Sequence, residues 1–137
     1  MTPDMLAKLH ARAFDGQSRA WDAAEFSGLL ESAHVFAVGD ARGFALGRVI
    51  AGEAELLTIA TDPDARRQGL GRACLAAYEA EARARGADIA FLEVAEDNTA
   101  ALALYRAAGY EQAARRTGYY ARHDGTRCDA LILRKAL

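Results

Sequence analysis

The segment at residues 66–71, Arg-Arg-Gln-Gly-Leu-Gly, is rich in glycine and arginine and could bind an anionic ligand. It lies between a strand-like apolar stretch and a long alanine-rich stretch typical of a helix. That placement gathers backbone N–H groups at a helix N-terminus, where the helix dipole attracts phosphate. Gly69 and Gly71 permit close approach and unusual backbone angles. Positive charge comes from Arg66, Arg67 and Arg72. We interpret the segment as a phosphate-binding loop; the alternative is a tight turn flanked by solvated arginines.

Three kinds of phosphate-binding loop can be compared with this segment. The chain contains no Walker-type string, G-x-x-x-x-G-K-S/T. The dinucleotide pattern G-x-G-x-x-G begins at Gly69, but Cys74 stands where the third small residue belongs. Glu93 has nearly the spacing of a ribose contact but lies inside its strand, and the chain has no room for a second dinucleotide-binding half. Residues 66–71 do fit an acyl-coenzyme A loop, R/Q-x-x-G-x-G/A, whose amides hold the coenzyme pyrophosphate.

Glu93 is a carboxylate inside the otherwise apolar segment 89–95. An ionised carboxylate in a strand that excludes water is costly unless it is paired or hydrated. Strand alternation places Glu93 on one face with Phe91, so we expect it to face a cleft and to serve as a general base. The alternatives are a sheet-edge position or a structural ion pair with one of the 15 arginines.

Asn98 and Tyr105 lie seven positions apart, which is two helical turns, and therefore share one helix face. Asn98 stands at a helix start, so it is a candidate both for helix capping and for ligand binding. A tyrosine on an apolar stripe is most often a core residue with its hydroxyl at the boundary. Tyr105 is nevertheless the candidate for a catalytic hydroxyl.

The elements that must position these residues alternate along the chain. We expect helices at 4–14, 22–31, 70–85 and 99–108, and strands at 34–38, 44–50, 53–61, 88–95, 110–116 and 127–134. Asp4 and Asp22 are the expected caps of the first two helices, and Glu25 completes a capping box with Asp22. The strand–helix–strand unit over 53–95 predicts two parallel strands with a right-handed crossover. The predicted fold class is α/β with a mixed sheet, not a doubly wound one.

Composition limits the function classes. The chain is 52% hydrophobic and 26% charged, as in a globular protein, and its length suits one domain over residues 1–137. A net charge of −2 gives no basic face for nucleic acid, and no apolar stretch is long enough to span a membrane. The N-terminus has no signal-peptide features. Cys74 and Cys128 form neither a disulfide framework nor a metal pair, so we expect a cytoplasmic protein without metal.

Taken together, these motifs resemble the GNAT superfamily of N-acetyltransferases. The resemblance covers residues 55–120 and rests on four strings: Ile59-Ala60-Thr61-x-Pro63, the loop 66–71, Leu92-Glu93-Val94, and Asn98-x-x-Ala101-x-x-Leu104-Tyr105-x-x-x-Gly109-Tyr110. The last two strings, followed by Arg115-Arg116, Tyr119-Tyr120, Asp124-Gly125 and Asp129-Ala130, look most like the bacterial ribosomal-protein-alanine acetyltransferase branch.

The resemblance implies a mostly antiparallel sheet with one parallel pair at the coenzyme site and about four flanking helices. Residues 1–52 would form the acceptor side, and residues 53–137 would bind acetyl-CoA and carry the catalytic groups. Glu93 would be the general base and Tyr105 the general acid. The implied acetyl-CoA contacts are Ile59, Ala60, Thr61, Arg66, Arg67, Gln68, Gly69, Leu70, Gly71, Arg72 and Asn98. The implied acceptor contacts are Trp21, Tyr119 and Tyr120.

The implied reaction is acetyl transfer from acetyl-CoA to a primary amine, with a protein N-terminal α-amine as acceptor and a monomer or weak dimer as the active form. Two alternatives stay open: a small-molecule amine as acceptor, and an acyl-CoA-binding module without turnover, against which Glu93 and Tyr105 argue. The sequence departs from the family at two places. It begins at the first helix, so we expect a sheet one strand shorter than usual, and residues 117–118 are Thr-Gly where the branch tends to have an asparagine.

Overall fold

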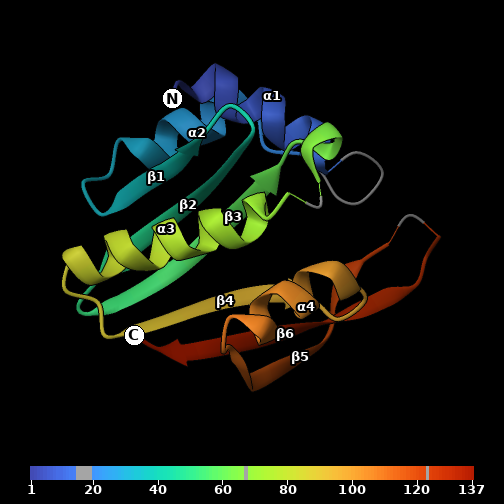
Figure 1. Ribbon diagram of the computed structural model, residues 1–137. Helices are drawn as coiled ribbons and strands as arrows, with labels where there is room; N and C mark the ends of the chain where they lie inside the picture. The colour runs from blue at the N-terminus through green and yellow to red at the C-terminus, as the bar shows by residue number, and fades with distance from the viewer. Residues whose placement is uncertain (15–19, 67, 123) are drawn as a thin grey trace.

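The computed structural model describes residues 1–14, 20–66, 68–122 and 124–137, and its elements follow the predicted order (Figure 1). The helices are α1 (Pro3–Ala13), α2 (Ala23–Leu30), α3 (Leu70–Ala84) and α4 (Thr99–Ala107), with a short 3₁₀ turn, η1 (Pro63–Ala65). The strands are β1 (Val35–Asp40), β2 (Gly43–Ile50), β3 (Glu53–Thr61), β4 (Ile89–Ala95), β5 (Glu111–Ala121) and β6 (Arg127–Ala136). Within the described ranges, no helix is long and apolar enough to cross a membrane.

The first two helices begin at caps that the local sequence supplies. At α2 the Asp22 side chain accepts the Glu25 N–H, and the Glu25 side chain accepts the Asp22 N–H, which confirms the predicted capping box. At α1 the prediction was wrong by two residues, because the cap is Thr2 and not Asp4. Pro3 occupies the first helical position, where its fixed φ and missing N–H are tolerated, so the cap must precede it.

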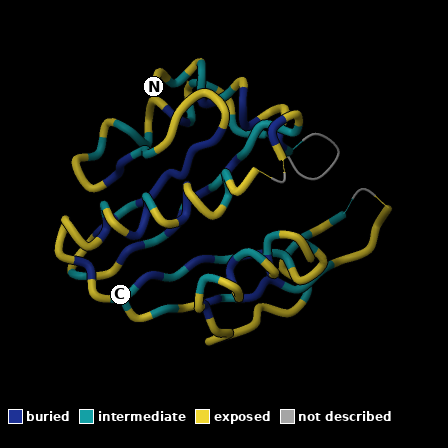
Figure 2. The backbone as a smooth tube through the Cα atoms, viewed as in Figure 1, coloured by how far each residue is buried: buried dark blue, intermediate teal, exposed yellow. Residues whose placement is uncertain are grey.

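Six strands form one mixed sheet in the order β1-β2-β3-β4-β6-β5. Only β3 and β4 are parallel, and every other neighbouring pair is antiparallel, as the predicted fold class requires. Strand β2 shows how the two faces are covered. Phe44 and Leu46 pack into a cluster with residues of α1 and α2, whereas Ala45 between them packs with residues of α3 and α4. Figure 2 shows the buried strands lying between these two helical layers.

The parallel pair separates soon after it begins. β3 and β4 are paired only at Glu53–Ile89, Ala54–Ala90 and Glu55–Phe91, although the two strands continue to residues 61 and 95. β3 stays bonded to β2 as far as Thr61, and β4 stays bonded to β6 as far as Ala95. The sheet therefore opens between β3 and β4, and Figure 1 shows the two strands diverging toward the right of the view.

The last hairpin is longer than the sequence predicts. The sequence predicts this strand over residues 110–116, which leaves Tyr119 and Tyr120 in the connection to the next strand. That prediction was wrong, because β5 continues to Ala121 through an irregularity in its pairing with β6 between Arg116 and Tyr120. A β-bulge accommodates the extra residues of β5 without ending the strand.

Candidate active site

A cleft of about 670 Å³ opens where β3 and β4 diverge. The diverging strands supply residues 56–59 and 92–95, and the start of α4 supplies residues 97–101. The remaining lining residues are His10, Phe14, Trp21, Tyr105, Tyr120 and Arg122. The cleft thus brings together residues from the N-terminal helices, the centre of the sheet and the last hairpin.

Glu93 lies in the middle of β4 and faces this cleft. Ile132 of β6 pairs with it on one side, and β3 has already separated from β4 on the other. The Tyr120 hydroxyl donates a hydrogen bond to Glu93 Oε1 at 3.3 Å. Among the residues that the structure describes, no arginine or lysine forms an ion pair with Glu93. The half-buried carboxylate is therefore available to a group that enters the cleft.

Tyr105 reaches the same cleft from α4. Its side chain is buried, with the ring edge-on to Tyr110 at a centroid distance of 6.1 Å. Burial raises the pKa of Tyr105 to about 12, because the charged phenolate would lose its hydration. The hydroxyl is consequently protonated at neutral pH and can act as a proton donor.

Asn98 combines the two roles that its position suggested. Its side-chain oxygen accepts the Ala101 N–H at 3.2 Å and so caps α4. The same residue lines the cleft. Capping holds the side chain at the cleft wall, where its amide N–H groups can still donate to a ligand.

The glycine-rich loop ends at the N-terminus of α3. Gly69 is the N-cap residue, with φ +75°, and within the described ranges no side chain caps the helix. The first N–H groups of α3 are therefore without a capping side chain, which suits an anion. The sequence suggested unusual angles at Gly71 as well, but Gly71 lies within the helix, and only Gly69 adopts a positive φ.

The side chains around the loop have different surroundings. Arg66 Nη2 donates to the Ala13 carbonyl oxygen at 3.4 Å, so this arginine points toward the C-terminal end of α1. Gln68 and Arg72 are exposed, and Leu70 is half-buried. Arg67 lies outside the described residues. None of the described loop residues lines the cleft, so the loop lies outside it.

The end of β3 contributes three further predicted contacts. Ile59 lines the cleft, whereas Ala60 packs into the apolar cluster beneath α1 and α2. Thr61 is half-buried at the end of the strand. From Leu56 onward β3 has lost β4 as a partner, so the backbone edge that faces away from β2 is open to a ligand.

The predicted acceptor residues separate into two groups. Trp21 and Tyr120 line the cleft. Tyr119 does not; it is 50% exposed, and the guanidinium of Arg116 lies 5.3 Å from its ring centroid. The two rings still meet edge to face, with their centroids 5.2 Å apart, so Tyr119 packs against Tyr120 without lining the cleft itself.

The sequence analysis did not single out His10, which is only 2% exposed and lines the cleft. Its Nδ1 accepts the Trp21 N–H at 3.1 Å, and its Nε2 lies 3.1 Å from Thr58 Oγ1. Its ring stacks on Phe14 at 4.2 Å. His10 thereby holds the Trp21 wall against β3. A polar residue within the apolar face formed by Leu6, Leu9 and Ala13 was the signal that could have revealed it.

Arg122 is a second cleft residue that the sequence analysis did not select. Its Nη2 pairs with Asp97 Oδ1 at 2.6 Å and its Nε donates to Asp97 Oδ2 at 3.2 Å. These two contacts join the residue that follows β5 to the residue that precedes the Asn98 cap of α4. The ion pair therefore connects the hairpin side of the cleft to the side formed by the start of α4.

Comparison with known proteins matches residues 4–110 to the model of the acetyltransferase (GNAT) family. The ribosomal protein bS18-alanine N-acetyltransferase of Escherichia coli is 45% identical over 95 residues, which cover 69% of this chain and 64% of that protein. The N-alpha-acetyltransferase RimI of Mycobacterium tuberculosis is 38% identical over 123 residues, covering 83% of this chain and 75% of that protein. The match therefore spans less than two thirds of the length of the Escherichia coli relative.

Solved structures of other proteins have the same fold as this chain. The crystal structure of the Escherichia coli ribosomal-protein-S18-alanine N-acetyltransferase superposes with a TM-score of 0.85 at 33% identity, covering 98% of this chain and 86% of that one. Naa20 of Chaetomium thermophilum, solved with a bisubstrate analogue, superposes with a TM-score of 0.83 at 22% identity, covering 100% and 84%. The second likeness concerns the fold alone.

Proposed function

The chain belongs to the GNAT family of acetyltransferases, and we propose that it transfers the acetyl group of acetyl-CoA to the N-terminal α-amine of a protein. The proposed acceptor is the N-terminal alanine of a ribosomal protein, in line with the names of its relatives. The observation that carries the proposal is the meeting of Glu93 and Tyr105 in one cleft, at the place where β3 and β4 diverge. We propose the cytoplasm as its compartment and a monomer or weak dimer as its active form.

The residues present fit acetyl-CoA. The open edge of β3 at residues 59–61 can bond to the amides of an extended arm, and the start of α3 offers N–H groups to a pyrophosphate. Asn98 would contact the arm between these regions. The loop contacts proposed are Arg66, Arg67, Gln68, Gly69, Leu70, Gly71 and Arg72.

When bound, acetyl-CoA supplies a thioester carbonyl that a neutral amine can attack and a thiolate that can leave. An α-amine has a pKa of about 7.7–8.0, so much of it is protonated at neutral pH. Glu93 takes that proton, directly or through a water. Backbone N–H groups near residues 59–61 donate to the carbonyl oxygen as it gains charge. As the new C–N bond replaces the C–S bond, Tyr105 gives its proton to the departing sulfur, and the acylated nitrogen releases its second proton to the resulting phenolate or to water.

The proposed acceptor path lies between the N-terminal helices and the last hairpin. Trp21 forms the wall on one side, and Tyr120 forms the wall on the other. Tyr119, which is exposed and packs edge-on against the Tyr120 ring, is proposed to contact acceptor residues farther from the amine. A path with a wall on each side can hold an extended peptide chain, whereas a small amine would need only the part of the path next to Glu93.

The test is a comparison of acceptors under one set of conditions. Release of free coenzyme A should be measured with peptides that differ at the first residue, with a panel of small amines, and with an N-acetylated peptide as control. We expect a peptide with N-terminal alanine to be consumed and the blocked peptide to be inert. Turnover of small amines with no turnover of any peptide would replace the protein acceptor with a small-molecule one.

A further inference from the structure

β5 contains a bulge directly before Tyr120. Arg116 pairs with Ala130 of β6, and Tyr120 pairs with Cys128. Three residues of β5, at 117–119, therefore lie opposite the single residue Asp129 of β6. The strand carries two more residues than its partner over this interval.

Side chains from both strands hold the bulge in place. Gly118 adopts φ +61°, a left-handed conformation that few residues other than glycine and asparagine adopt readily. Its N–H donates to Asp129 Oδ1 at 2.8 Å, and its carbonyl accepts from Arg127 Nε at 2.7 Å. Arg115 Nη1 donates to the other Asp129 oxygen at 2.6 Å. The Gly118 N–H and Arg115 lower the pKa of Asp129, so the carboxylate that holds the bulge is ionised at neutral pH.

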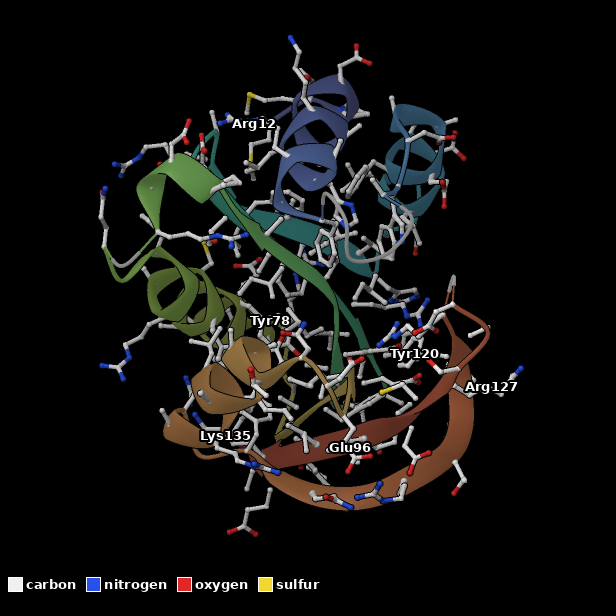
Figure 3. All side chains as sticks on the ribbon, turned by 90° about the vertical axis from the view of Figure 1, so that its right-hand side faces the viewer. Arg12, Tyr78, Glu96, Tyr120, Arg127 and Lys135 are labelled. Carbon is white, nitrogen blue, oxygen red and sulfur yellow. The ribbon has the colours of Figure 1, made fainter. Side chains whose placement is uncertain are left out.

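The bulge determines where Tyr120 lies along the sheet. In a regular pairing that continued from Arg116–Ala130, Tyr120 would stand opposite Thr126. The two extra residues bring it opposite Cys128, which is about 7 Å nearer to the part of β6 that pairs with Glu93. Figure 3 shows Tyr120 on the side of the hairpin that faces the N-terminal elements, with Arg127 extending outward.

We propose that Tyr120 is a positioning residue for the general base Glu93, and that the bulge at Gly118 exists to deliver its hydroxyl there. The inference rests on the proposed function of Glu93. The hydrogen bond at 3.3 Å engages Oε1 and leaves Oε2 for the acceptor amine. A donated hydrogen bond also favours the ionised carboxylate, the form that can accept a proton.

Tyr120 can donate this hydrogen bond over the whole pH range of an activity assay. Burial, followed by the charge of Glu93 and the hydrogen bond to it, raises the pKa of Tyr120 to about 12. Tyr120 therefore remains a donor at neutral and moderately alkaline pH. The other titratable and charged side chains that line the cleft are His10 from α1, Asp97 after β4, Tyr105 from α4 and Arg122 after β5.

The first experiment compares Tyr120→Phe with Tyr78→Phe. The two variants lose the same atom, but the buried Tyr78 hydroxyl has no hydrogen-bond partner among the described residues and lies outside the cleft. For Tyr120→Phe we expect kcat to fall about tenfold, the usual effect of losing a hydrogen bond to a charged group. The acid limb of its pH–rate profile should move to higher pH, while the KM for the acceptor stays nearly unchanged because the ring remains. Tyr78→Phe should match the wild type.

The second experiment tests the bulge itself. Gly118→Val should reproduce the loss seen in Tyr120→Phe, because a β-branched residue resists a positive φ. In the double variant with Tyr120→Phe the two losses should not add, since both remove one interaction. Gly118→Asn should recover most of the activity, because asparagine tolerates the left-handed conformation.

The outcomes separate this inference from the proposed function. An active wild type whose kcat and acid limb are unchanged in Tyr120→Phe overturns the inference and leaves the proposed function standing. A rise in acceptor KM alone would make Tyr120 an acceptor contact and would also overturn it. A wild type that acetylates no amine in the panel overturns the proposed function, and this inference with it.

Discussion

At Glu93 and Tyr105, two groups with opposite proton roles face one cleft from different elements. Glu93 lies on β4 beyond the point where β3 stops pairing with that strand. Its carboxylate accepts a hydrogen bond from Tyr120. Tyr105 comes from a helix and is buried, which keeps it protonated. The two environments differ enough that one group is suited to accept a proton while the other donates one.

The first prediction concerns Glu93→Gln. We expect acetyl transfer to slow by roughly 10²–10⁴-fold, the usual effect of losing a positioned acid–base group. Part of the rate should return at alkaline pH, where the amine loses its proton unaided. Binding of acetyl-CoA, followed by thermal shift, should persist because the side chain keeps its shape. The measurement is the pH–rate profile of both proteins with one competent amine.

Glu96→Gln is the matched control for that experiment. Glu96 lies three residues along the chain, pairs with Arg115 at 2.7 Å and does not line the cleft. Its replacement should leave the profile close to that of the wild type. If the profiles of wild type and Glu93→Gln coincide in height and shape, Glu93 has no part in proton transfer.

The second prediction concerns Tyr105→Phe. Because burial raises the pKa of Tyr105 to about 12, the group stays protonated through an assay from pH 6 to 10. Its loss should therefore lower kcat by a similar factor at every pH and should not move either limb of the profile. The Kd for acetyl-CoA should change little. A variant with unchanged kcat would show that another group, or solvent, protonates the leaving thiolate.

At the scale of elements, the start of α3 depends on one backbone conformation. Gly69 adopts φ +75° as the N-cap, and a β-carbon there would meet no atom of the described residues within 4 Å. The restriction at this position is thus conformational and not steric. Gly71, by contrast, is helical, and an added β-carbon would meet Leu104 Cδ2 at an ordinary distance of 3.4 Å.

The third prediction is that Gly69→Val abolishes the rise in Tm that acetyl-CoA produces in the wild type. A β-branched residue resists the left-handed conformation, so the N–H groups at the start of α3 should move away from the pyrophosphate. Thermal denaturation with and without acetyl-CoA measures the effect.

Gly86→Val provides the control for strain alone. Gly86 follows the opposite end of α3 with φ +88°, and there too an added β-carbon would contact no described residue within 4 Å. This variant should lose comparable stability yet keep the ligand-dependent rise in Tm. An equal response to acetyl-CoA in both variants would remove the loop from coenzyme binding.

At the scale of the whole molecule, the divergence of β3 and β4 creates the cleft but weakens the sheet. Only three residue pairs join the two strands, so other contacts must tie the C-terminal strands to the rest. Glu79 of α3 supplies such a contact, because it is buried and binds two partners from the C-terminal part. Lys135 Nζ lies 2.8 Å from its Oε1, and the Tyr110 hydroxyl donates to its Oε2 at 2.9 Å.

The fourth prediction is that Glu79→Gln lowers the free energy of unfolding by about 2 kcal/mol, since it weakens two charge-assisted hydrogen bonds at a buried position. Glu81→Gln makes the same change two residues away, in a partly exposed pair with Arg85. That control should stay within about 0.5 kcal/mol of the wild type. Urea denaturation measures both, and equal effects would mean that the Glu79 contacts do not join the two parts of the sheet.

The order and type of the elements could be predicted from the sequence because their signals are local. The alternation in β4 placed Glu93 on one face with Phe91, away from the buried residues of the strand, and the capping box at Asp22 marked the start of α2. The spacing of Asn98 and Tyr105 placed both on one helix face, and the structure brings both to the cleft. Such signals depend only on residues within a few positions of each other.

The tertiary structure alone decided which distant residues meet. Tyr120 reaches Glu93 across 27 positions only because the pairing of β5 with β6 contains a bulge. His10 contacts Thr58 across 48 positions, and Arg66 donates to the Ala13 carbonyl oxygen at the end of α1 across 53 positions. Each of these contacts depends on strand register and helix packing. A shift of one residue in register would turn every side chain of a strand to the opposite face, so spacing along the chain cannot specify them.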